Sequence, residues 1–62
     1  MKRSFESPEF GPVTYMHSTP IAFFQAGQVL EGVDEAWLGS GQPLTFEEVW
    51  RLEQELRAEN RL

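Results

Sequence analysis

Residues 44–61 read LTFEEVWRLEQELRAENR, and this stretch decides the fold. Thr45 and Glu48 match a capping box. In that motif the threonine side chain accepts a hydrogen bond from the backbone of the third helical residue, and the glutamate side chain accepts one from the backbone of the cap. Neither glycine nor proline interrupts the stretch. It therefore predicts a C-terminal helix over about residues 45–60.

Apolar side chains follow one face of this predicted helix. At about 100° per residue they fall within an arc of roughly 160°, which is a wide amphipathic stripe. The members of the stripe are Phe46, Val49, Trp50, Leu52 and Leu56. A stripe of this width predicts that this face of the helix packs on the core.

Glu53 is the charged residue that falls inside the apolar arc, and Arg57 follows it by one turn. A lone buried carboxylate is costly, so we expect Glu53 to be partly exposed and to pair with Arg57 at the rim of the core. Trp50 would then be half covered at the adjacent edge. The alternative is an ordinary surface pair between Glu53 and Arg57, with Trp50 inside the core.

Strand-like segments precede the helix, and turn signals at 18–20 and 26–27 separate them. The segments are 13–17, 21–25 and 28–30. They predict a two- or three-stranded antiparallel meander over about residues 12–31, packed against the helix. The fold class expected is therefore α+β, in one small domain over 1–62.

Two segments lack a clear pattern. Residues 1–12 hold two prolines and a glycine, and we expect an irregular N-terminal arm over 1–11. The segment 32–44 is predicted to be a loop or a helical turn. Within it, 33–38 could form a helical turn that begins at Asp34 and stops at Gly39, or else a short strand; we favour the turn.

Composition limits the classes of function. The chain has 62 residues, ten acidic against five basic side chains, a net charge of −5 and no cysteine. A domain of this size is marginally stable, and without cysteine it has no disulfide to help. The acidic balance disfavours direct binding to nucleic acid or to anionic membranes. The longest apolar run, at 21–24, is too short for a signal peptide or a membrane span, so we expect a cytoplasmic protein.

Catalytic and metal-binding patterns are not found in the sequence. His17 is the single histidine, and neither a HxxxH nor a CxxC spacing occurs. Asp34 and Glu35 lack the alternating oxygen ligands of a calcium loop. The loop at 39–41 has no lysine after it and does not match a phosphate-binding motif. We expect no enzyme activity, no metal and no cofactor.

The aromatic residues point to protein binding instead. A small domain cannot enclose all eight aromatic side chains, and an exposed tryptophan often anchors an interface. We predict a partner-binding surface formed by Trp37, Trp50, Glu53 and Arg57. The function expected is a non-catalytic interaction module that docks onto a larger protein and modulates it. A short, acidic, cysteine-free chain without a catalytic set is typical of inhibitors and accessory proteins of phages and mobile elements.

Two other functions fit the same sequence. A DNA mimic would present carboxylates in rows, but the helix interleaves five glutamates with three arginines, as in an ordinary solvated face. A structural subunit or homodimer could instead form through the C-terminal helix, with Glu53 facing Arg57 of a second copy.

Overall fold

A three-stranded antiparallel sheet and one helix make up the fold seen in the computed structural model, which describes residues 2–17, 23–25, 28–30 and 32–62. The elements in chain order are β1 (Lys2–Ser7), β2 (Gly11–His17), β3 (Phe23–Gln25), β4 (Gln28–Leu30), β5 (Val33–Leu38) and α1 (Phe46–Ala58). The sheet has the order β1-β2-β5, and β3 pairs with β4 in a separate hairpin. The predicted α+β class, with a C-terminal helix packed on an antiparallel sheet, is confirmed.

The helix α1 begins as the sequence predicts. The side chain of Thr45 accepts from the backbone N–H of Glu48, and the side chain of Glu48 accepts from the backbone N–H of Thr45. The helix ends in a Schellman motif, in which Asn60 adopts a positive φ of 56° and Arg61 N–H donates to the carbonyl of Leu56 at 2.8 Å. This turn directs Arg61 toward Phe5 of β1 and Leu62 toward Gly32, just before β5.

One face of the sheet, which we call the inner face, packs on α1. Antiparallel pairing places Phe5 opposite Val13 and Tyr15 opposite Ala36, and neighbouring residues along a strand point to opposite faces. The buried core is therefore built from alternate strand residues together with one helix stripe: Phe5, Val13, Tyr15, Val33, Ala36, Val49, Leu52 and Leu56.

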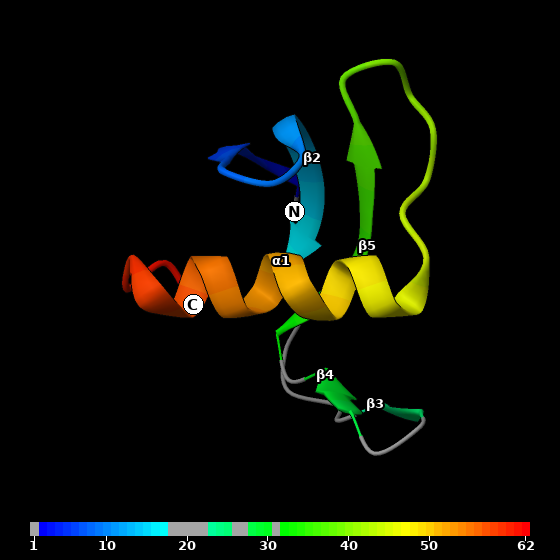
Figure 1. Ribbon diagram of the computed structural model, residues 1–62, viewed down its shortest axis with the longest axis vertical. Helices are drawn as coiled ribbons and strands as arrows, with labels where there is room; N and C mark the ends of the chain where they lie inside the picture. The colour runs from blue at the N-terminus through cyan, green and yellow to red at the C-terminus, as the bar shows by residue number, and fades with distance from the viewer. Residues whose placement is uncertain (1, 18–22, 26–27, 31) are drawn as a thin grey trace.

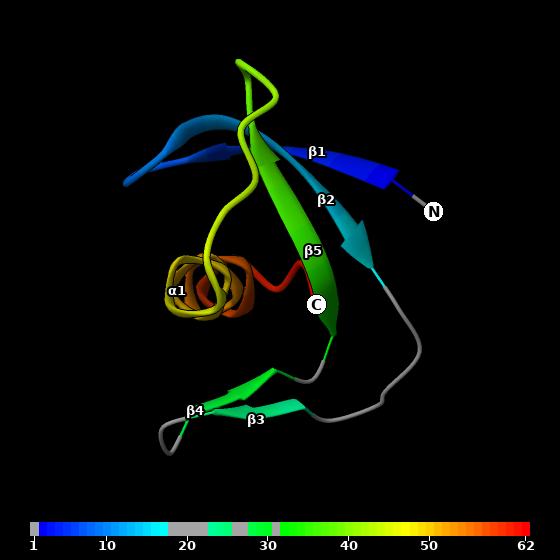
Figure 2. The same ribbon diagram turned by 90° about the vertical axis from the view of Figure 1, so that its right-hand side faces the viewer.

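The helix lies between the sheet and the β3–β4 hairpin (Figures 1 and 2). Contacts of α1 with both β4 and β5 agree with this arrangement. The strands predicted at 13–17 and 28–30 are confirmed, and so is the described part of the one predicted at 21–25, since 23–25 form β3 and 21–22 lie outside the described residues. The grouping of the three strands in one sheet is wrong. The segment 28–30 does not join the sheet, because β1 and β5 occupy the two edges of β2. The predicted turns at 18–20 and 26–27 lie outside the described residues.

The N-terminal arm over 1–11 was predicted to be irregular, and this is wrong. Residues Lys2–Ser7 form β1, which pairs with β2 through a turn at 8–10. Gly11 follows that turn with φ of 74°, a conformation that glycine adopts without steric cost. The strand was missed because Phe5 is its only large apolar residue.

The favoured helical turn at 33–38 is also wrong, because these residues form β5. The pairing of β2 with β5 shifts register between Met16 and His17, which leaves Asp34 as an extra residue on β5. This irregularity places the buried residues Val33 and Ala36 three apart. The segment therefore lacks the period of two that would have indicated a strand, and the cap and stop signals at Asp34 and Gly39 favoured the turn.

The described part of the chain contains no helix long and apolar enough to cross a membrane. The single helix there, α1, has 13 residues.

Candidate functional site

Glu53 lies inside the protein, with a side chain that is 0% exposed. Its Oε2 atom accepts hydrogen bonds from the backbone N–H groups of Gly32 at 3.2 Å and Val33 at 3.1 Å. Its Oε1 atom accepts one from the guanidinium of Arg57 at 2.9 Å. The expected partial exposure of Glu53 is therefore wrong. The carboxylate avoids the cost of burial because two backbone donors and one cation surround it.

The pair of Glu53 and Arg57 joins the helix to the start of β5. Arg57 keeps 42% of its side chain exposed, so the ion pair lies at the boundary of the core, as predicted for the pair. The backbone contacts at Gly32 and Val33 fix where the chain enters β5. In this conformation the Glu53 side chain is not accessible to a partner. Its hydrogen bonds connect α1 to the start of β5.

Trp50 is half-buried and packs against the hydrophobic core. Its place on the helix follows the amphipathic stripe that the sequence predicts. The ring therefore belongs to the packing of α1, and only part of it reaches the surface.

Trp37 lies elsewhere, on the face of the sheet that points away from α1, which we call the outer face. Its neighbours along the strand, Ala36 and Leu38, both pack in or against the core, so alternation directs Trp37 outward. The ammonium group of Lys2 lies over its ring, 5.1 Å from the centroid. The structure therefore does not bring the four predicted site residues together. It separates Trp37 from the helix group Trp50, Glu53 and Arg57.

The outer face consists of alternate residues from all three strands of the sheet. Strand pairing places Thr14 between Ser4 and Trp37, and Met16 between Lys2 and Glu35. Among the described residues, no helix or strand packs on this face (Figure 2). Trp37, Thr14 and Met16 are half-buried there, and they are surrounded by exposed charged residues.

Two open hollows flank Trp37. One, of about 350 Å³, is bordered by Lys2, Thr14 and the 39–41 loop. The other, of about 270 Å³, lies where β5 meets Pro43 and the start of α1. A side chain of a partner protein could therefore enter a hollow on either side of the Trp37 ring.

A second cluster, at the turn between β1 and β2, was missed by the sequence reading. Ser7 is buried, and its hydroxyl donates to the carboxylate of Glu55 while accepting from the backbone N–H groups of Glu9 and Phe10. Arg51 pairs with Glu9 at 2.9 Å and with Glu47 at 3.3 Å. The pairs attach the turn to α1 and give this cluster a structural role. The only sequence signal was the position of Ser7 before Pro8, which is typical of a turn.

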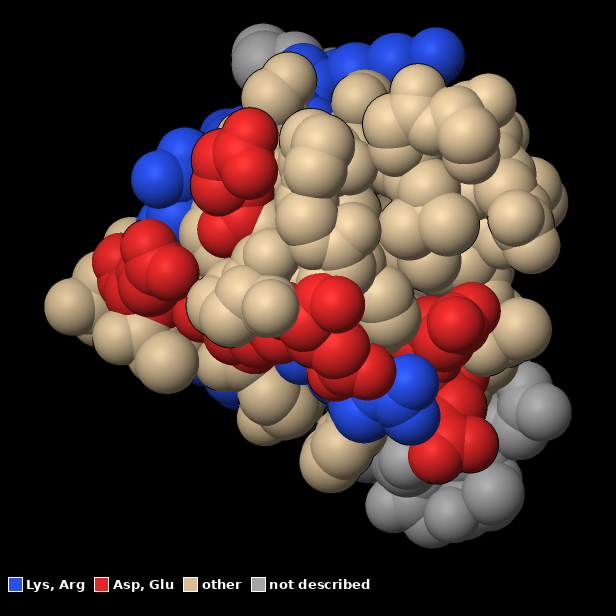
Figure 3. Space-filling model, turned by 45° about the horizontal axis from the view of Figure 1, so that its top comes forward, with Lys and Arg blue, Asp and Glu red and all other residues tan. Residues whose placement is uncertain are grey.

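Charge on the surface is mixed in sign. Arg51 and Arg57 each pair with helix glutamates, and in Figure 3 basic side chains lie beside some of the acidic ones. Within the part of the chain that the structure describes, no group of three or more His, Asp or Glu side chains is placed to hold a metal ion.

Comparison of the chain with family models, with curated proteins and with solved structures found no match.

Proposed function

We propose that the chain is a non-catalytic protein-binding module that docks, in the cytoplasm, onto a larger protein and modulates it. The observation that carries this proposal is the position of Trp37 on the outer face of the sheet. The ring is only half-buried, the described elements leave it uncovered, and Lys2 lies over it. Tryptophan is among the residues most enriched at the energetic centres of interfaces.

The surroundings of Trp37 resemble the anatomy of an interface. Half-buried Thr14 and Met16 lie in the middle of the face, and exposed Glu6, Asp34 and Glu35 lie around them. Interfaces have such a centre of apolar and aromatic groups within a polar rim. Because most of the charges in this rim are acidic, the complementary partner surface has an apolar pocket bordered by lysine or arginine.

The chain would modulate its partner by remaining bound to it. A module without catalytic groups changes the activity of its partner by covering a surface that the partner uses or by holding one of its conformations. Inhibition is the simplest such effect, and it is the form of modulation that we propose for this chain.

The proposal is tested by capturing the partner with the tagged chain and then measuring affinity for two variants. Trp37→Ala should weaken binding by about 30-fold or more, as for a residue at an energetic centre. Gln54→Ala, at an exposed position on α1, is the matched control and should bind like the wild type. Equal affinities for the wild type and Trp37→Ala would show that the outer face is not the binding surface.

Salt dependence separates this function from DNA mimicry. An interface centred on Trp37 should keep most of its affinity as salt increases, because apolar contact is not screened. A mimic would lose its affinity at high salt and would tolerate Trp37→Ala. The interleaved ion pairs of Arg51 and Arg57 on the helix favour the first outcome.

A further inference from the structure

The outer edge of β1 is open. The strand order β1-β2-β5 leaves an edge at each end of the sheet. The edge of β5 is occupied, because Leu38 N–H donates to the carbonyl of Gln42 and Leu44 N–H donates to the carbonyl of Ala36, at 2.8 and 2.9 Å. No described segment pairs with the outer edge of β1. An edge of this kind presents a row of backbone donors and acceptors to another strand.

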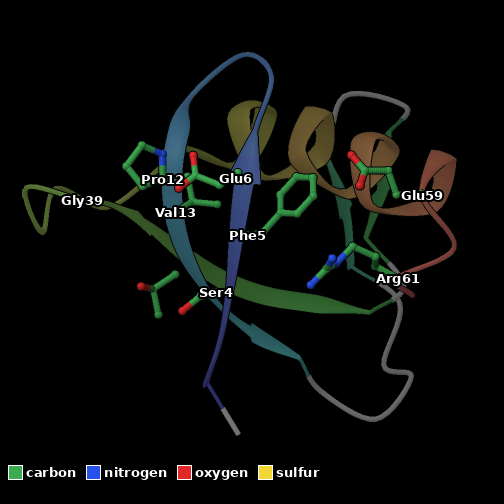
Figure 4. Close-up of a pocket in the computed structure, with 9 residues that line it drawn as sticks. Ser4, Phe5, Glu6, Pro12, Val13, Gly39, Glu59 and Arg61 are labelled. Atoms are coloured by element: carbon green, nitrogen blue, oxygen red, sulfur yellow. The ribbon is translucent and has the colours of Figure 1, made fainter.

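The same edge borders a hollow of about 430 Å³. In Figure 4, β1 runs through the centre of the view, with Phe5, Glu59 and Arg61 on one side and Ser4, Glu6 and Pro12 on the other. The inner side is closed by the guanidinium of Arg61, which lies 5.4 Å from the centroid of the Phe5 ring. A strand added here would meet a charged residue on each face.

We propose that the occupant of this edge is the β1 strand of a second copy, running antiparallel and centred on Ser4. A two-fold axis perpendicular to the sheet places the inner faces of the two copies on the same side of the joined sheet. Residues directly opposite each other across the axis must then lie on the same face of the sheet. Centring on Ser4 satisfies this condition. The result is one continuous six-stranded sheet, with both helices on one side and both Trp37 rings on the other.

Charge complementarity selects this register. With Ser4 on the axis, Lys2 lies opposite Glu6 of the second copy, and Glu6 lies opposite its Lys2. On the inner face, Arg3 lies opposite Phe5 of the second copy, beside which Glu59 borders the hollow. Opposite charges directly across an antiparallel pair are stabilising, whereas like charges are destabilising.

Neighbouring registers lack this match. Centring on Arg3 places two guanidinium groups opposite each other, and centring on Phe5 moves Lys2 beyond the end of the paired segment. Charged residues on an edge normally prevent pairing. Here Lys2 and Glu6 complement the same two residues of a second copy. The charges therefore disfavour pairing with other strands and in other registers, but they permit pairing of β1 with the β1 strand of a second copy.

The dimer goes beyond the proposed function and does not depend on it. Lys2 and Glu6 also border the surface around Trp37, but self-association is measured on the chain alone, without a partner protein. Its test is the oligomeric state of the full chain by sedimentation velocity at increasing concentration. The wild type should dimerise, and the dissociation constant should rise with salt because the pairs of Lys2 and Glu6 are exposed.

Charge reversal tests the register. Lys2→Glu and Glu6→Lys each place like charges across the axis and should weaken the dimer by about tenfold or more. Mixing these two variants restores opposite charges at both pairs and should restore dimerisation, as should the double reversal within one chain. Both positions are exposed, and circular dichroism should show that each variant keeps its fold.

A cysteine at the axis tests the centre of the pairing. The chain has no cysteine, and directly opposed residues of an antiparallel pair are close enough for a disulfide. Ser4→Cys should cross-link two chains under mild oxidation much faster than Ser40→Cys in the exposed 39–41 loop. The proposal is overturned by a chain that stays monomeric, by a dimer indifferent to both reversals, or by equal cross-linking at the two positions.

Discussion

Glu53 is a buried carboxylate on α1 that accepts hydrogen bonds from the start of β5. The sequence indicates that a carboxylate lies within an apolar stripe, and desolvation alone argues for exposure. The structure instead surrounds the carboxylate with the N–H groups of Gly32 and Val33 and with Arg57. Those backbone donors come from a segment 20 and 21 residues earlier in the chain, so the helix sequence carries no signal for them.

Replacing Glu53 should destabilise the protein in proportion to the hydrogen bonds lost. Glu53→Leu removes the carboxylate that accepts from the buried N–H of Val33 and the partly buried N–H of Gly32, and the expected loss is about 3–5 kcal/mol. Glu53→Gln retains one oxygen acceptor and should lose less. Urea denaturation followed by circular dichroism measures both. A Glu53→Leu variant as stable as the wild type would contradict the role of the carboxylate as a link between α1 and β5.

The two tryptophans should respond differently to truncation. Trp50 packs against the core, so Trp50→Ala is expected to lower the free energy of unfolding by about 3 kcal/mol. Trp37 is on the outer face, and Trp37→Ala should lower it by about 1 kcal/mol or less. The midpoints of urea denaturation give the comparison. A larger loss for Trp37→Ala than for Trp50→Ala would place Trp37 in the core and would remove the basis of the proposed binding face.

At the scale of elements, the helix could be predicted because its signals are local. The capping box at Thr45 and Glu48 and the apolar stripe both lie within one segment, and both are present in α1. The strands β1 and β5 could not be predicted in the same way. Their buried residues are few, and in β5 the register shift beside Asp34 interrupts the period of two. Pairing with β2 determines both strands, and such pairing joins residues far apart in the sequence.

The turn between β1 and β2 should depend on Ser7 more than on the ion pair beside it. Ser7→Ala removes a buried hydroxyl that serves Glu9 N–H, Phe10 N–H and Glu55, and the expected loss of stability is about 1–3 kcal/mol. Glu9→Ala removes a partly exposed pair with Arg51, which is worth less than about 1 kcal/mol. Chemical denaturation of the two variants should rank them in this order, and the reverse order would show that the ion pair holds the turn.

At the scale of the whole molecule, the candidate site could be predicted only in part. An excess of aromatic residues over what a small core can enclose correctly indicates that some tryptophan surface remains uncovered. The sequence does not show that Trp37 and Trp50 lie on different sides of the molecule, because that depends on β5 being a strand and on α1 covering only the inner face. The contribution of Lys2 to the surface around Trp37 cannot be predicted either, because it depends on β1 being a strand paired with β2.

The central claim is that a partner protein binds the outer face of the sheet around Trp37. The most direct measurement is the change in amide chemical shifts of the isotope-labelled chain when the captured partner is added. We expect the shifts to cluster on the outer face, at Lys2, Thr14, Glu35 and Trp37, and the exposed face of α1 around Glu47 and Gln54 to be unchanged. Shifts concentrated on α1, with the amides around Trp37 unaffected, would contradict it.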